Sequence, residues 1–77
     1  MPSMSETSFG EWIRRRRKAL DLTQEQLAEI VGCSHSAIRK FETDQRRPSL
    51  QIAELLATHL KISPDQRSLF LKVARGR

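Results

Sequence analysis

The polar side chains with the most distinctive chemistry lie between residues 24 and 42 of this 77-residue sequence. Four of them fall on the outer face of a helix predicted to begin at residue 35: His35, Ser36, Arg39 and Lys40. An imidazole, a hydroxyl, a guanidinium and an ammonium group on one exposed face are available to hydrogen-bond a polar partner. These residue types predict that the face binds a partner.

Catalysis and metal binding are poorly supported by the same residues. His35 has no acid and no nucleophile arranged around it, so it is predicted to be no general base. Cys33 is the single cysteine, which excludes an intramolecular disulfide and a cysteine-based zinc cluster. His35 and His59 lack partners at metal-ligand spacing. We therefore expect no catalytic residue, no metal and no cofactor, and we expect Cys33 to fill the core.

The charge balance favours an acidic partner. Lys and Arg number 14 against 9 Asp and Glu, a net charge of +5, which is typical of small nucleic-acid-binding domains. Charge alone does not decide, because many basic domains only carry a solvated basic face. The run from Arg14 to Lys18 is read mainly as such a face, since five consecutive helical residues point in different directions. Arg17 alone is expected on the inner side, where it needs a carboxylate partner.

The chain is long enough for one domain, predicted over residues 8–75 after a disordered N-terminal tail at 1–7. Charges interrupt every apolar stretch, and nothing near Met1 resembles a signal peptide. We therefore expect a cytoplasmic protein that does not enter membranes. A further domain in a longer parent chain stays open.

The apolar positions recur at intervals of three and four, which predicts an all-α protein, a compact bundle of about five helices. The expected helices cover about 8–20, 24–31, 35–43, 50–60, and a last segment from 64 onward. Their expected N-caps are Ser8, Thr23, Ser34, Ser49 and Ser63, with capping boxes closed by Glu11, Gln26 and Gln66. In the last helix Leu69, Phe70 and Val73 are expected to face inward, with Leu71 and Ala74 off that face.

The second and third helices have the residues that a tight, steep turn between helices requires. Ala28 is small where the two helices cross, and Gly32 tolerates the positive φ that opens the turn. The apolar positions on both sides of this turn all face the expected core: Leu27, Val31, Cys33, Ile38 and Phe41. A helix-turn-helix is therefore predicted at residues 24–42.

This stretch resembles the Cro/repressor (XRE-type, lambda-repressor-like) helix-turn-helix family. The resemblance is carried by Leu22-Thr23-Gln24-Glu25-Gln26-Leu27-Ala28-Glu29, by Gly32-Cys33-Ser34 and by Ile38-Arg39-Lys40-Phe41-Glu42. Ile13-Arg14, Arg17 and Arg47-Pro48-Ser49 fit the same pattern, so that about residues 9 to 62 are covered. The family implies a bundle of about five helices that binds operator DNA, commonly as a symmetric dimer.

Position by position, the resemblance implies that helix 35–42 is the recognition helix. His35, Ser36 and Lys40 would touch base edges, with Arg39 beside them. The DNA backbone would be contacted by Gln24, Thr23, Ser34, Arg46 and Arg47, and Gln24 would also brace the recognition helix. Arg17 and Glu42 would form a structural ion pair. His35 stands where the family often has glutamine or arginine, and Thr43-Asp44 where it often has Asn-Gly, which leaves the base preference and the loop shape open.

The function expected from these features is sequence-specific binding of double-stranded DNA by a transcriptional regulator, or by the DNA-binding domain of one. We expect a homodimer on a pseudo-palindromic operator, with a monomer in solution left open and residues 69–74 as the candidate contact. The alternative is an antitoxin-type or other protein-interaction module on the same scaffold. Its sign would be an exposed apolar strip in place of the polar face at His35 to Lys40.

Overall fold

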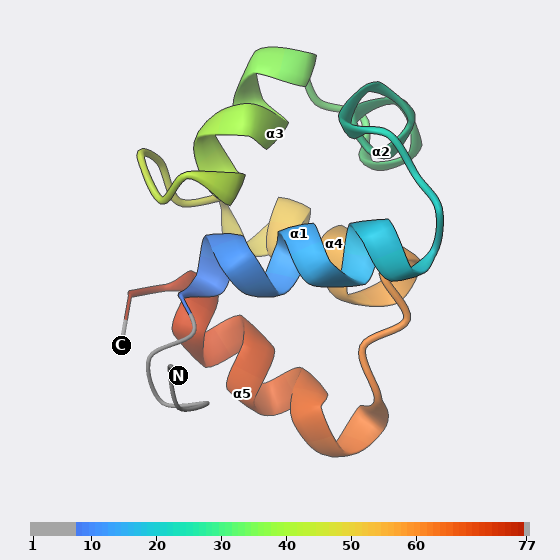
Figure 1. The fold of residues 1–77 in the computed structure, drawn as a ribbon. Helices are drawn as coiled ribbons and strands as arrows, with labels where there is room; N and C mark the ends of the chain where they lie inside the picture. Colours follow the sequence, from blue (N-terminus) through green and yellow to red (C-terminus); the bar gives the residue numbers. More distant parts are fainter. Residues whose placement is uncertain (1–7, 77) are drawn as a thin grey trace, which may run out of the picture.

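The computed structural model describes residues 8–76 and folds them into five α-helices. The helices are α1 (Phe9–Ala19), α2 (Gln24–Val31), α3 (His35–Glu42), α4 (Leu50–His59) and α5 (Pro64–Ala74). In Figure 1, α1 runs between the α2–α3 pair on one side and α5 on the other. The predicted all-α bundle is confirmed, with α2 and α3 forming the helix-turn-helix. The predicted tail at 1–7 lies outside the described residues.

The helix starts follow from side-chain caps. Ser8, Thr23, Ser34 and Ser49 each accept a hydrogen bond from the backbone N–H three residues further on. Of the three predicted capping boxes, the one at Thr23 forms, with Gln26 Oε1 accepting from the Thr23 N–H at 2.8 Å. The other two predictions are wrong. The Glu11 carboxylate instead pairs with arginines one turn further on, and Ser63 makes no side-chain cap bond.

The helix ends share one turn geometry. Gly32 closes α2 with a φ of 77°, as its residue type predicts. The turns after α1, α3 and α4 use the same left-handed conformation without glycine, at Asp21 (φ 62°), Asp44 (φ 60°) and Lys61 (φ 56°). Asp44 Oδ1 also accepts from the Gly10 N–H at 3.0 Å, so that the loop after α3 is tied to the start of α1.

The core is built from apolar residues of all five helices. Its largest fully buried side chains are Ile13, Leu27, Ile38, Leu56, Leu60 and Phe70. Phe70 attaches α5 to α1, because its ring lies 5.0 Å from that of Phe9 and 5.1 Å from that of Trp12, centroid to centroid. The predicted inner face of α5 is partly wrong. Ala74, one helical turn after Phe70, is buried, whereas Leu69 is 53% exposed.

The inner side of α1 has two structural arginines instead of the one predicted. Besides Arg17, the half-buried Arg16 donates from Nε to the Leu60 carbonyl oxygen at 3.1 Å, satisfying the end of α4. The start of α1 also packs against α3 without intervening side chain. A Cβ at Gly10 would overlap the carbonyl oxygens of Phe41 and Glu42.

Across residues 8–76, no helix is both long and apolar enough to cross a bilayer.

Candidate nucleic-acid interface

One face of α3 is polar and open, while the opposite face is buried. The four residues predicted on the outer face are all exposed: His35, Ser36, Arg39 and Lys40. Ala37, Ile38 and Phe41 are buried on the inner side. The alternation places the polar groups together at the surface with no large apolar side chain among them. Such a face presents donors and acceptors to a partner rather than packing against one.

The turn before α3 sets the direction in which this face points. Gly32 and Cys33 both donate their backbone N–H to the carbonyl of Ala28, at 2.9 and 3.0 Å, which closes the end of α2. Ser34 then caps α3, its Oγ accepting from the Ala37 N–H at 3.0 Å. Backbone and cap hydrogen bonds thus determine where α3 begins relative to α2.

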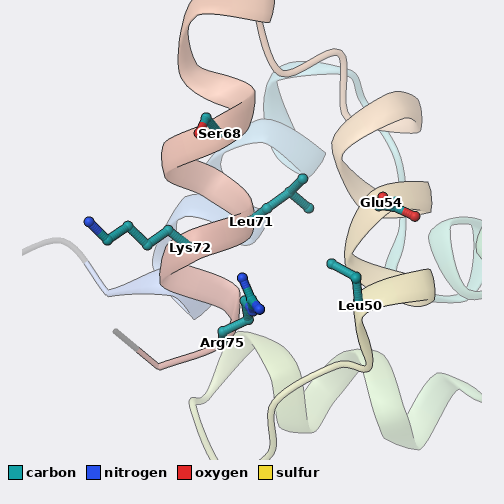
Figure 2. A pocket seen from close by; sticks show the side chains of 6 residues that line it. All are labelled: Leu50, Glu54, Ser68, Leu71, Lys72 and Arg75. Carbon is teal, nitrogen blue, oxygen red and sulfur yellow. The ribbon is translucent and has the colours of Figure 1, made fainter.

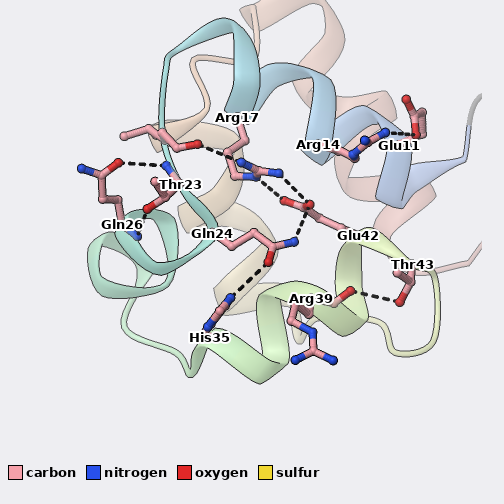
Figure 3. Close-up of polar contacts among 11 residues, drawn as sticks. Glu11, Arg14, Arg17, Thr23, Gln24, Gln26, His35, Arg39, Glu42 and Thr43 are labelled. Atoms are coloured by element: carbon pink, nitrogen blue, oxygen red, sulfur yellow. Dashed lines mark hydrogen bonds and ion pairs between the residues drawn. The ribbon is translucent and has the colours of Figure 1, made fainter.

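An ion pair holds the far end of α3 against α1. Arg17 donates to Glu42 twice, from Nε to Oε2 at 2.6 Å and from Nη2 to Oε1 at 3.1 Å (Figure 3). A third bond runs from Arg17 Nη1 to the Leu22 carbonyl at 2.9 Å. The Glu42 side chain is 3% exposed and that of Arg17 is 11% exposed. The two expected partners therefore lie together, away from solvent and off the polar face.

Gln24 connects this ion pair to the start of α3. Its Nε2 donates to Glu42 Oε1 at 3.0 Å, and its Oε1 lies 3.1 Å from His35 Nε2 (Figure 3). One side chain at the first residue of α2 thus contacts both ends of α3. This is the bracing position expected of Gln24, and one N–H of its amide is left over for a further acceptor.

A shallow hollow of about 280 Å³ lies along the polar face. It is lined by Gln24, Ser36, Arg39, Lys40, Thr43 and Gln45. Thr43 and Gln45 did not emerge as site residues from the sequence. Both belong to the turn that follows α3, where the Thr43 hydroxyl donates to the Arg39 carbonyl at 3.0 Å and the Gln45 N–H donates to that of Lys40 at 2.9 Å. Their polarity directly after an amphipathic helix was the available signal.

The two loop arginines differ in their surroundings. Both are exposed. Arg47 extends toward the end of α5, where its Nη1 donates to the Val73 carbonyl at 3.4 Å and its side chain packs beside Gly76. Arg46 lies near Cys33 instead. Burial raises the pKa of the half-buried Cys33 thiol, and the positive charge of Arg46 opposes that rise. At neutral pH Cys33 is therefore a thiol that packs against the core.

A larger hollow, of about 820 Å³, lies between α4 and α5 (Figure 2). Its lining combines apolar and charged side chains: Leu50, Glu54, Ser68, Leu71, Lys72 and Arg75. It has no residue in common with the polar face of α3. Within residues 8–76, no group of three or more His, Cys, Asp or Glu side chains is placed to hold a metal ion. The polar face of α3 is therefore the arrangement with the clearest binding chemistry.

The chain is similar to known helix-turn-helix proteins. A helix-turn-helix family model matches residues 13–66. Over 62 residues the chain is 37% identical to repressor protein C2 of Salmonella phage P22, covering 80% of this chain. It is 46% identical over 48 residues to an uncharacterized HTH-type transcriptional regulator of Methanothermobacter thermautotrophicus, covering 62% of this chain. It is 32% identical over 56 residues to the cryptic phage CTXphi transcriptional repressor RstR of Vibrio cholerae, covering 73% of this chain.

These matches span different shares of the relatives. They cover 29% of the phage P22 protein, 50% of the Vibrio protein and 70% of the Methanothermobacter protein. No solved structure matches the chain. The chain thus spans half or less of the length of the phage P22 and Vibrio proteins that it matches.

Proposed function

This chain belongs to the Cro/repressor-type helix-turn-helix family, and we propose that it is a sequence-specific DNA-binding domain that regulates transcription. The observation that carries the proposal is the face of α3, polar and exposed on one side and buried on the other. Base edges in the major groove are read by such a stripe of donors and acceptors on a helix. The net charge of +5 favours DNA further, because phosphates attract the domain at a distance. As a DNA-binding regulator, the protein would act in the cytoplasm, at the nucleoid.

In the proposed complex α3 lies in the major groove with its first residues nearest the bases. His35, Ser36 and Lys40 read base edges, and Arg39 reaches a base or the backbone. The backbone is held by Arg46, by the spare N–H of Gln24 and by the hydroxyls of Thr23 and Ser34, which accept cap bonds and keep their hydrogens for a phosphate oxygen. Arg47 joins them on leaving its long contact with Val73.

Two domains act together in this proposal. A single recognition helix reaches about four or five base pairs, and a sequence that short recurs too often in a genome to specify one site. Two domains bound to a pseudo-palindrome double the number of base pairs that are read. The half-sites would lie about 10 base pairs apart, or a multiple of that. Of the segment 69–74 expected at the dimer contact, Ala74 is buried in its own domain and is unavailable.

The alternative of a protein-interaction module predicted an apolar strip on α3. The large apolar residues that are exposed among residues 8–76 are Ile30, Leu50 and Leu69, and none belongs to α3. The face that would grip a protein partner in that reading is thus polar, which favours DNA.

Selection of bound sites from a random duplex pool tests the function. Lys40→Ala and Ser36→Ala should each change the preferred base at one position of each half-site. The cost should be about 1–3 kcal/mol for Lys40, which can contact a guanine through two atoms, and about 0.5–1.5 kcal/mol for the single hydroxyl of Ser36. Arg46→Ala should weaken all sequences alike. Lys72→Ala removes another exposed lysine, from α5, and is the matched control. Identical sequence logos for the parent, Lys40→Ala and Ser36→Ala would mean that this face does not lie in the groove.

A further inference from the structure

His35 is the last residue in a chain of hydrogen bonds. An ion pair at the other end of this chain determines which atoms donate and which accept. The chain begins at Arg17, passes through Glu42 and Gln24, and reaches His35 (Figure 3). It crosses from α1 to the end of α3, then to the start of α2, and returns to the start of α3. Each member therefore restricts the hydrogen-bonding role of the next.

The direction follows from the carboxylate. Glu42 is ion-paired with Arg17 and nearly inaccessible to water, so its oxygens only accept hydrogen bonds. The Gln24 atom that faces Glu42 must therefore be the amide nitrogen, at 3.0 Å from Oε1. The amide oxygen of Gln24 then faces His35 Nε2 at 3.1 Å. An oxygen at this distance requires a donor, so Nε2 carries a proton.

A neutral imidazole has one N–H and one lone pair, so a proton on Nε2 leaves Nδ1 as an acceptor. Nε2 is engaged with Gln24, and Figure 3 shows the other ring nitrogen turned away from it. His35 itself is exposed at the first position of α3. What this residue offers to a partner in its neutral form is thus a single lone pair.

Resting on the proposed function, we infer that neutral His35 selects a base bearing an exocyclic amino group, adenine or cytosine, on the strand that it faces, since every base pair carries one such base on one strand or the other. In the major groove adenine presents its N6 amino group and cytosine its N4 amino group, both of which donate. Guanine presents only acceptors there, and thymine an acceptor and a methyl group. The lone pair of Nδ1 finds no donor on either base and stays unpaired. Gln24 and the buried ion pair are positioning residues for this selection, because they act through His35.

The first arm of the test needs no DNA. In the ¹⁵N spectrum of the labelled protein at pH 8, His35 should show a protonated Nε2 whose hydrogen exchanges slowly. His59, an exposed histidine in α4, is the internal reference and should exchange rapidly. Gln24→Ala should remove the protection at His35. A proton on Nδ1 of His35 in the parent protein would overturn the relay.

The second arm varies the base opposite His35 through all four identities at pH 8. Adenine or cytosine should bind about 2–10-fold more tightly than guanine or thymine, the size of one net hydrogen bond. His35→Ala should abolish this preference, Gln24→Ala should narrow it, and His59→Ala should leave it unchanged. A guanine preference that disappears in His35→Ala would overturn the base assignment. If no duplex binds while Nε2 is protonated and protected, the proposed function fails with the base assignment, and the relay stands.

Discussion

At the scale of single residues, the pair formed by Arg17 and Glu42 connects the end of α3 to α1. The Glu42 side chain is only 3% exposed. Every hydrogen bond that it accepts comes from a residue outside its own helix. Removing either partner leaves a charge in a poorly hydrated place, which costs more than the pair itself contributes.

Glu42→Ala and Arg17→Ala should each lower the free energy of unfolding by about 3 kcal/mol, the cost of an unpaired buried charge. The double variant should lose less than the sum, because no stranded charge remains. Urea unfolding measures all three. Glu11→Ala is the control, since it removes a carboxylate that is 35% exposed and paired with exposed arginines, which is worth about 0.2–1 kcal/mol. A Glu42→Ala loss no larger than that of Glu11→Ala would contradict the structural role.

At the scale of the helices, several helix ends share one hydrogen-bonded turn. After α1, α3 and α4 the N–H of Leu22, Gln45 and Ile62 bonds to a carbonyl five residues earlier, at 3.1, 2.9 and 3.0 Å. This turn requires a left-handed residue just before. A glycine adopts that conformation after α2 (Gly32) and after α5 (Gly76), whereas α1, α3 and α4 are followed by a residue with a side chain. At Asp21, Asp44 and Lys61 the backbone of a residue with a side chain is left-handed, which costs about 1–2 kcal/mol where glycine would incur no such cost.

Lys61→Gly should therefore stabilise the domain. Relief of about 1–2 kcal/mol of backbone strain exceeds the 0.4–1 kcal/mol or so of extra chain entropy that glycine adds to the unfolded state. We expect the free energy of unfolding to rise by up to about 1 kcal/mol, measured by urea titration. Lys72→Gly makes the same substitution inside α5 and should instead lower stability, by up to about 1 kcal/mol. A loss of stability in both variants would show that the turn does not carry strain.

At the scale of the whole molecule, charge and shape act together. The domain measures 30 × 25 × 23 Å and carries a net charge of +5. Exposed charges more than a Debye length apart, about 8 Å at physiological salt, are largely screened from one another. The cations of α3 and of the loop after it, beside the reading face, should therefore supply most of the electrostatic affinity for DNA, and those on the far side of the domain little.

The affinity for DNA should fall steeply with salt. With roughly 4–6 phosphates contacted per domain, the slope of log affinity against log salt should be about −4 to −5. Titration of a labelled duplex at several salt concentrations measures it. Arg46→Ala should make the slope shallower by about 1, whereas Lys72→Ala, off the reading face, should leave it unchanged. A flat slope in the parent protein would remove DNA as the ligand.

The sequence by itself determined the features whose hydrogen bonds close within a few residues. The caps at Thr23 and Ser34, the left-handed Gly32 and the division of α3 into a polar and an apolar face all follow from residue type and spacing. These interactions depend on the local backbone, which the same few residues control. The capping boxes predicted at Ser8 and Ser63 do not form. At Ser8 the reason is that the Glu11 carboxylate pairs with arginines of its own helix instead.

Contacts between distant segments were decided by the tertiary structure. Arg16 meets the carbonyl of Leu60 across 44 residues of sequence, and Gln24 meets Glu42 across 18. The close approach of Gly10 to the end of α3 and the burial of Ala74 likewise depend on how the helices cross. Crossing angles and helix rotations arise from packing of the whole core, so no local pattern specifies them. The orientation of the Gln24 amide, and with it the proton on His35, is therefore a property of the folded molecule.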